Sequence, residues 1–331
     1  MRAIEYRTFG PPVQVLRTVD VAIPQPGEGE VLLRVRAASV NALDWRMMMG
    51  RPRLARLFLR RARKAGAIRI GVDVAGIVEA IGPGVVRFHP GNCVFGVCRG
   101  AFAEYACTAE DRLAAKPANV GFAAAASVPV AATTALQGLR DLAGLRAGQQ
   151  LLIDGASGGV GTFAIQIAKA LGAEVTAVCS AHNIAIARAS GADHLIDYSR
   201  ENFARDPDRY DVVFAVNAHR SLFDHRRVLR RGGVHVIGGG GLSQIAQAFL
   251  LAPLLSRLGR TRSAVLMAKT TRADLETLAG MLASGALAPV IDRRYPLEAA
   301  AEAIAHVMQG HARGKTIVEM SPQGEPHKDP A

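Results

Sequence analysis

Hydrophobic and polar positions in the first third of the chain follow the short spacing of β-strands. Residues 30–40 alternate as a half-buried strand does, and residues 72–82 form a second apolar run. Shorter runs at 87–97 and 100–109 are separated by Pro and Gly. Strands at this spacing, with no long helical period between them, predict a compact, barrel-like β-rich unit.

The pattern changes after Lys116-Pro117, where an Ala-rich helical stretch leads into regular alternation of strands and helices. This alternation predicts a parallel, doubly wound sheet of the dinucleotide-binding kind, inserted into the β-rich unit. The predicted strands span 150–155, 174–180, 194–198, 211–216, 233–241 and 263–269. The chain is therefore expected to be α/β, with a discontinuous β-rich domain (1–122 and 271–320), an inserted domain (123–270) and a flexible tail (321–331).

Composition narrows the class of protein. With 331 residues, 50% of them hydrophobic and 21% charged, the chain can bury a large core, which excludes extended disorder. No apolar run reaches the roughly 20 residues of a membrane span, and no secretory signal is recognisable. The 4 cysteines are too few for a disulfide scaffold and lack CxxC spacing. We expect a reduced, cytoplasmic protein.

The charge balance, 40 Lys and Arg against 28 Asp and Glu, favours anionic partners. Nucleic acid is an unlikely one, since only 5% of residues are aromatic and a base-stacking platform needs aromatic side chains. The basic segment Arg51–Lys64 could lie as an amphipathic helix on an anionic membrane surface. A solvated helix over the substrate cleft is the interpretation that we favour.

The most informative motif is the glycine-rich turn Gly155-Ala156-Ser157-Gly158-Gly159-Val160-Gly161, between a predicted strand and a predicted helix. Glycines allow the backbone to approach a pyrophosphate, and the helix N-terminus offers free N–H groups and a partial positive charge. The turn, with the alternation that follows it, predicts dinucleotide binding.

Residues after the second strand of this domain indicate which dinucleotide is bound. A carboxylate about 20 positions beyond the glycines would bind the ribose 2′-hydroxyl of NAD. The chain has no carboxylate there before Asp193, and Ser180, His182 and Asn183 can instead donate hydrogen bonds to a 2′-phosphate. NADP is therefore the predicted cofactor.

Several segments together resemble the zinc-independent quinone oxidoreductase branch of the medium-chain dehydrogenase/reductase superfamily. They are AASVNALDWR, GVDVAGIVEAIG, PVAATTALQGL, GASGGVGTFAIQIAKALGAEVTAVCS, GADHLIDY and HARGKTIVEM. The resemblance covers roughly residues 1–320. It implies a GroES-like catalytic domain, an inserted Rossmann domain with the active site in the cleft between them, and a homo-oligomer, with a dimer favoured. It also implies hydride transfer from NADPH to quinones or α,β-unsaturated carbonyl compounds.

The resemblance further implies roles for individual residues. Asn41, and more weakly Arg46, are the expected catalytic donors to the substrate carbonyl oxygen, where negative charge develops. Thr134, Asn217, Gly238 and Gly239 are expected beside the nicotinamide, and Tyr198 beside the 2′-phosphate. The expected cofactor-binding residues are thus Thr134, Ala156, Ser157, Gly158, Gly159, Val160, Gly161, Ser180, His182, Asn183, Tyr198, Asn217, Gly238 and Gly239.

Zinc is not expected. The zinc-dependent relatives place a cysteine and a histidine ligand where this chain has Asn41 and Val72, and neither is a competent zinc ligand. The four-cysteine structural lobe of those relatives also has no counterpart. We therefore expect no metal.

Two other functions stay open. The turn Ala215-Val216-Asn217-Ala218 lacks the acid and the glycine of related sequences, so the protein could bind NADPH with little turnover and act through its basic RNA- or membrane-binding surface. A zinc-free alcohol dehydrogenase is the third reading. It ranks last, because the predicted site has no Lewis acid to polarise the alcohol and no evident base to take its proton.

Overall fold

The computed structural model describes residues 1–50, 67–205, 207, 209–216, 220–239, 261–310 and 312–320. Three features predicted from the sequence lie outside these residues: the basic segment Arg51–Lys64, the cofactor contact of Asn217 and the flexible tail. Within the described part of the chain, no helix is long and apolar enough to cross a membrane.

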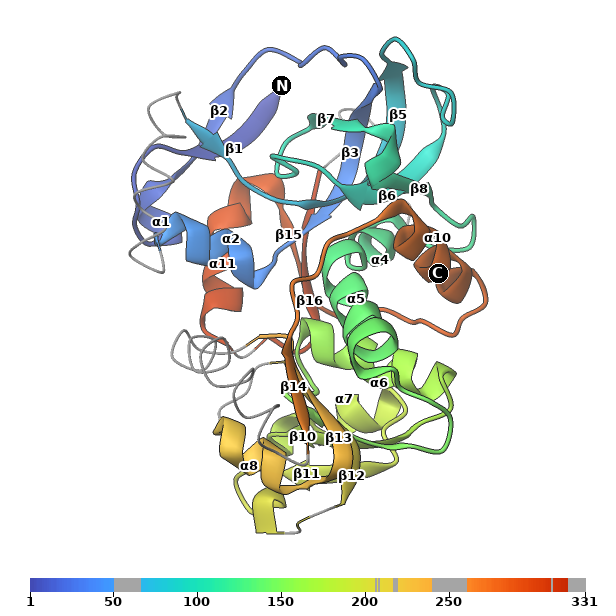
Figure 1. Ribbon diagram of the computed structural model, residues 1–331. Helices are drawn as coiled ribbons and strands as arrows, with labels where there is room; N and C mark the ends of the chain where they lie inside the picture. The colour runs from blue at the N-terminus through green and yellow to red at the C-terminus, as the bar shows by residue number, and fades with distance from the viewer. Residues whose placement is uncertain are drawn as a thin grey trace.

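Both chain ends build the β-rich half, at the top of Figure 1. A 3-stranded sheet has the order β2-β1-β4, and a larger sheet has the order β15-β16-β3-β5-β6-β8, with β7 also paired to β3. Strand β16, from the end of the chain, pairs with β3 and so closes this half. The strands are β1 (Arg2–Tyr6), β2 (Leu16–Asp20), β3 (Glu30–Ser39), β4 (Ile68–Arg69), β5 (Asp73–Ile81), β6 (Cys93–Val97), β7 (Tyr105–Ala109), β8 (Leu113–Ala115), β15 (Ile291–Pro296) and β16 (Lys315–Glu319).

The middle of the chain forms a 6-stranded sheet of order β11-β10-β9-β12-β13-β14, and every pairing in it is parallel. The prediction of a doubly wound parallel sheet is confirmed. The order reverses between β9 and β12, which is where such sheets bind ligands at the carboxyl ends of their strands. The strands are β9 (Gln150–Asp154), β10 (Glu174–Cys179), β11 (His194–Asp197), β12 (Tyr210–Ala215), β13 (Leu229–Ile237) and β14 (Arg262–Val265).

Helices α4 and α5 lie between the two halves (Figure 1), and a π-helical segment, Gln137–Ala143, continues α5. One buried cluster runs from Ala75 and Phe95 of the β-rich half through α4 and α5 to Phe163 of α6 and Phe214 of the parallel sheet. This shared core packs the two halves against each other. The helices are α1 (Pro12–Val15), α2 (Ala42–Met48), α4 (Phe122–Ala126), α5 (Pro129–Leu136), α6 (Gly159–Ala170), α7 (Ile184–Ala189), α8 (Leu222–Arg227), α10 (Arg272–Ala283) and α11 (Ala300–Met308).

Candidate active site

The glycine-rich turn lies at the switch point of the parallel sheet, between the end of β9 and the start of α6. Gly155 turns the chain with φ of +89°, and the N–H of Ala156 donates to Val178 O of β10 at 3.1 Å. Gly158 is the N-cap of α6, and no side chain caps the helix there. The N–H groups of the first turn of α6 are therefore left for an anionic ligand.

The glycines of this turn do different work. A Cβ added at Gly161 would lie 2.3 Å from Gly155 O, so this glycine is needed for the turn to pack against the helix. A Cβ added at Gly158 would meet only Gly155 O, at 3.7 Å. Gly158 thus leaves open space above the helix N-terminus, as a pyrophosphate would require.

The predicted contacts to the adenosine end come together beside this turn. Asn183 Nδ2 donates to Ser157 Oγ at 3.0 Å, and the N–H of Asn183 donates to Ser180 O at 2.9 Å. Asn183 Oδ1 is buried with no hydrogen-bond partner among the described residues, which marks it as an acceptor awaiting a ligand. His182 and Tyr198 are both exposed, and their contact with a 2′-phosphate stays a prediction.

Gly238 and Gly239 follow β13 at the same edge of the sheet. A Cβ at Gly238 would lie 2.8 Å from the Phe214 ring, and one at Gly239 would lie 2.1 Å from Val216 O. Both glycines therefore bring the backbone close to the end of β12. The two glycines directly follow strand β13, and their contact with a nicotinamide stays a prediction.

Asn41 belongs to a buried polar cluster in the β-rich half, together with Asp73 and Lys315. Its Nδ2 donates to Asp73 Oδ2 at 2.9 Å, and its Oδ1 accepts from Lys315 Nζ at 2.8 Å. Asp73 Oδ2 also accepts from Ser39 Oγ at 2.7 Å. Asn41, Asp73 and Lys315 are all less than 9% exposed. The amide of Asn41 is thus held in one orientation by groups of opposite charge.

Lys315 connects this cluster to the glycine-rich turn. Gly314, the residue before it, forms a parallel bridge with Gly158. A Cβ at Gly159 would lie 2.9 Å from Lys315 Cδ, so the lysine side chain runs past the start of α6. Lys315 also lies 3.4 Å from Asp73 Oδ2. The Lys315 side chain therefore lies beside both the glycine-rich turn and the polar cluster.

Sequence reasoning missed Asp73 and Lys315. Both lie inside apolar strand patterns, in GVDVAGIV and GKTIVEM. A search for catalytic motifs passes over single charged residues within such strands. The signal that could have found them is the ionisable residue itself, because a charged side chain in a buried strand needs a partner of opposite charge. The two residues are 242 positions apart, so only the fold shows that they pair.

Arg46 and Thr134 are placed less directly. Arg46 is half-buried, its guanidinium lies 5.4 Å from the centre of the Trp45 ring, and burial lowers its pKa. Thr134 Oγ1 donates to Val130 O within α5, and the N–H of Val130 donates to Asp73 Oδ1 at 2.9 Å. Thr134 therefore lies one helical turn from the polar cluster, while a role for Arg46 in the reaction stays a prediction.

Asp44 is a buried carboxylate beside this cluster, and its pKa is raised. Its Oδ2 accepts from the N–H of Asn41 at 2.7 Å and caps α2. Burial raises the pKa of Asp44 to about 7, the hydrogen bond from Asn41 opposes this rise, and the charge of Asp73 adds to it. Asp44 is therefore a structural acceptor whose protonation changes near neutral pH.

We expect Asp44→Asn to flatten the pH dependence of stability. A carboxylate with a raised pKa in the folded state stabilises fully below its unfolded pKa of roughly 4, and this contribution is lost as pH rises towards 7. Urea unfolding from pH 4 to 8 should show the variant gaining on the parent protein by about 1.4 kcal/mol per pH unit, up to pH 7. Asp111→Asn, at an exposed site, is the control. Parallel curves for Asp44→Asn and the parent would contradict the assignment.

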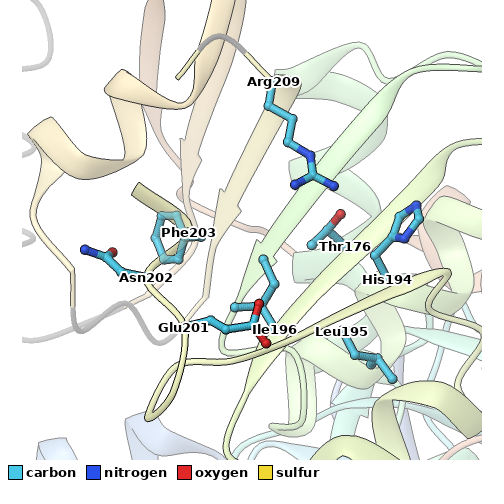
Figure 2. A pocket seen from close by; sticks show the side chains of 8 residues that line it. All are labelled: Thr176, His194, Leu195, Ile196, Glu201, Asn202, Phe203 and Arg209. Atoms are coloured by element: carbon cyan, nitrogen blue, oxygen red, sulfur yellow. The ribbon is translucent and has the colours of Figure 1, made fainter. Parts of the chain in front are cut away.

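The described side chains form no cluster of metal ligands, and a cavity lies away from the predicted site residues. Across the described ranges, no three or more His, Cys, Asp or Glu side chains are grouped as metal ligands would be. A cavity of about 240 Å³ lies elsewhere in the parallel-sheet half, at the β10–β11 edge (Figure 2). It is lined by Thr176, His194, Leu195, Ile196, Glu201, Asn202, Phe203 and Arg209, none of which is a predicted site residue.

Comparison with known proteins agrees with this arrangement. Two family models match the chain, "Alcohol dehydrogenase GroES-like domain" over residues 27–118 and "Zinc-binding dehydrogenase" over residues 190–318. The chloroplast envelope quinone oxidoreductase homolog of Arabidopsis thaliana is 34% identical, over 96% of this chain and 98% of that protein. The NADPH-dependent alkenal/one oxidoreductase of the same plant is 30% identical, over 96% of this chain and 79% of that protein.

A solved structure gives the same result. The quinone oxidoreductase from Coxiella burnetii superposes with a TM-score of 0.86 and 29% identity, covering 97% of this chain and 99% of that chain. The GroES-like half and the Rossmann sheet are therefore both those of the medium-chain dehydrogenases/reductases. The chain is an oxidoreductase that belongs to the quinone oxidoreductase branch of this superfamily.

Proposed function

We propose that the protein is an NADPH-dependent reductase that transfers a hydride to quinones or α,β-unsaturated carbonyl compounds without zinc. The observation that carries this proposal is Lys315, which runs from the glycine-rich turn to the amide of Asn41. The residues fit the cofactor, because space is open at Gly158 and the buried acceptor Asn183 Oδ1 faces no partner among the described residues. When bound there, NADPH supplies the hydride.

The chain's own residues position the acceptor and stabilise its charge. Asn41 donates one amide N–H to Asp73, and its second N–H is the donor that we assign to the substrate oxygen. Lys315 Nζ, 2.8 Å from Asn41 Oδ1, polarises the amide and strengthens that donor. The same ammonium group would repel a zinc ion at this place, which supports the zinc-free assignment. The final proton comes from solvent.

The test is consumption of NADPH, with NADH in parallel, against ortho- and para-quinones and short enones. Saturable turnover with NADPH supports the proposal, and the preferred acceptor outlines the pocket. Tight binding of NADPH without turnover against the whole panel would contradict it and favour a binding protein. A cytoplasmic location and a homodimer also stay predictions, which cell fractionation and light scattering after gel filtration test.

We expect Ser180→Asp to reverse the choice of cofactor. Ser180 directly follows β10. A carboxylate at this position would repel the 2′-phosphate of NADPH and would accept a hydrogen bond from the 2′-hydroxyl of NADH. The KM for NADPH should rise by at least about 10-fold while turnover with NADH is kept or improved. Ser180→Ala, which removes the hydroxyl without adding charge, is the matched control. Equal losses with both cofactors in Ser180→Asp would show that Ser180 lies away from the 2′-position.

A further inference from the structure

Two histidines are buried together beneath the strand that leads into the glycine-rich turn. His225, in α8, places its Nε2 3.0 Å from Asp154 Oδ2, and Asp154 is the last residue of β9, directly before Gly155. His235, in β13, has its ring 4.9 Å from that of His225. Each histidine is 1% exposed. His225 therefore contacts Asp154, the residue directly before the glycine-rich turn, and His235 packs behind His225.

The surroundings of His235 favour its neutral form. Neither ring nitrogen of His235 has a hydrogen-bond partner within the described part of the chain, so a proton taken up there would find no acceptor. Burial, followed by the charges of His225 and Arg226, holds the pKa of His235 well below its usual range. The charged groups that lie against the two histidines are Asp154 from β9 and Arg226 from α8.

We propose that His225 is a positioning residue for Asp154 and the glycine-rich turn, and that proton uptake by the neighbouring His235 lowers the affinity for NADPH. This inference rests on the proposed function. A protonated His235 would be a buried positive charge with its ring 4.9 Å from that of His225, and neither of its N–H groups would have an acceptor within the described part of the chain. Acid conditions therefore favour a state in which α8 moves away from β13 and Asp154 loses its partner.

The sign of the effect follows from linkage. A histidine whose pKa is lowered by folding stabilises the folded state above its unfolded pKa, roughly 6.5, and this stabilisation is lost as pH falls. NADPH binds the form in which the turn is closed. Binding of the cofactor and binding of the proton are then mutually unfavourable, by the same factor in both directions.

The cavity of Figure 2 brings the surface close to the pair. Phe203 lines this cavity and stacks on His225, with ring centres 5.7 Å apart and an interplanar angle of 10°. One aromatic ring thus separates His225 from a polar cavity that also contains His194 and Glu201. A proton can reach the pair through a small movement of Phe203, without unfolding of the sheet.

The experiment measures the dissociation constant of NADPH by fluorescence between pH 8.0 and 5.5. His235→Phe keeps an aromatic ring without a titrating group, and His225→Gln keeps an amide donor for Asp154. Between pH 8.0 and 5.5 the constant should rise by about 10-fold more in the parent protein than in His235→Phe, because the 2′-phosphate titrates alike in both. His194→Gln, at a half-exposed histidine paired with Glu174, should follow the parent.

The outcomes separate this inference from the proposed function. At pH 8.0, His225→Leu should bind NADPH at least about 10-fold more weakly than His225→Gln, because leucine cannot hold Asp154. Parallel pH profiles for the parent and His235→Phe, or equal binding by the Leu and Gln variants, would overturn the inference while the proposed function stands. A parent protein that fails to bind NADPH at pH 8.0 would overturn both. If His235→Phe does not fold, the comparison of His225→Leu with His225→Gln carries the test alone.

Discussion

The Lys315→Met variant is expected to lose about 100-fold in kcat/KM for the preferred quinone or enone. Methionine keeps most of the length of the side chain but removes the ammonium group that contacts Asn41 Oδ1 and Asp73 Oδ2. The amide of Asn41 is then free to rotate away from the substrate oxygen. Steady-state kinetics should show the loss mainly in kcat, since Lys315 acts on the reacting end of the site.

The same variant should also be less stable, by about 3–5 kcal/mol, because Asp73 is left as an unpaired buried charge. Asp73→Asn should cost a similar amount for the converse reason. In the double variant, Lys315→Met with Asp73→Asn, no buried charge remains uncompensated, so its loss should be smaller than the sum of the two single losses. Strict additivity in urea unfolding would show that the two residues do not act as a pair.

A surface ion pair provides the control for this cycle. Lys169 and Asp193 lie 2.7 Å apart, and each side chain is more than one third exposed. Lys169→Met should cost less than about 1 kcal/mol, because solvent screens an exposed pair. A cost as large as that of Lys315→Met would mean that loss of a lysine, rather than burial of the charge, causes the effect.

Gly158→Val should abolish NADPH binding in a protein that remains folded, with a dissociation constant raised at least about 100-fold. Gly158 has φ of −79° and ψ of 176°, which valine adopts freely, and its Cβ would meet nothing closer than 3.7 Å. The added side chain therefore occupies the space of the pyrophosphate instead of disturbing the fold. Unchanged NADPH affinity would refute the assignment of this turn.

Gly161→Ala is the matched comparison. Its Cβ would lie 2.3 Å from Gly155 O and 2.6 Å from the carbonyl carbon of Ala156, so the backbone of the turn must shift. We expect a clear drop in melting temperature for Gly161→Ala and almost none for Gly158→Val. Thermal unfolding measured without cofactor distinguishes the two, and equal drops would mean that Gly158 also serves the packing of the turn.

Local pattern was sufficient for most of the fold. Strand–helix alternation after Gln150 predicts the parallel sheet, and the glycine spacing predicts where the chain turns into α6, because both are properties of neighbouring residues. The contact of Asn183 with Ser157 follows from the same logic, since the two residues lie in the turns that follow β10 and β9, which are adjacent strands of one sheet.

Contacts between distant segments could not be predicted in this way. Asp73 and Lys315 pair across 242 positions, and His225 meets Asp154 across 71, so neither pair leaves a spacing that periodicity could detect. In each pair the residue that the sequence makes visible is a charged one within an apolar strand: Asp73 or Lys315 in the first pair, and Asp154 in the second. Its partner is determined by the register of strands that no local rule fixes, such as β16 against β3.

The pairing of β16 with β3 also affects the order in which the two halves can form during synthesis. The parallel sheet uses one continuous stretch of chain and can form early, whereas Lys315 of β16 follows Asp73 of β5 by 242 positions and is made after that whole sheet. Before β16 is made, Asp73 has no ammonium group from this strand beside it. Nascent chains should therefore form the parallel-sheet half before the polar cluster of the other half is complete.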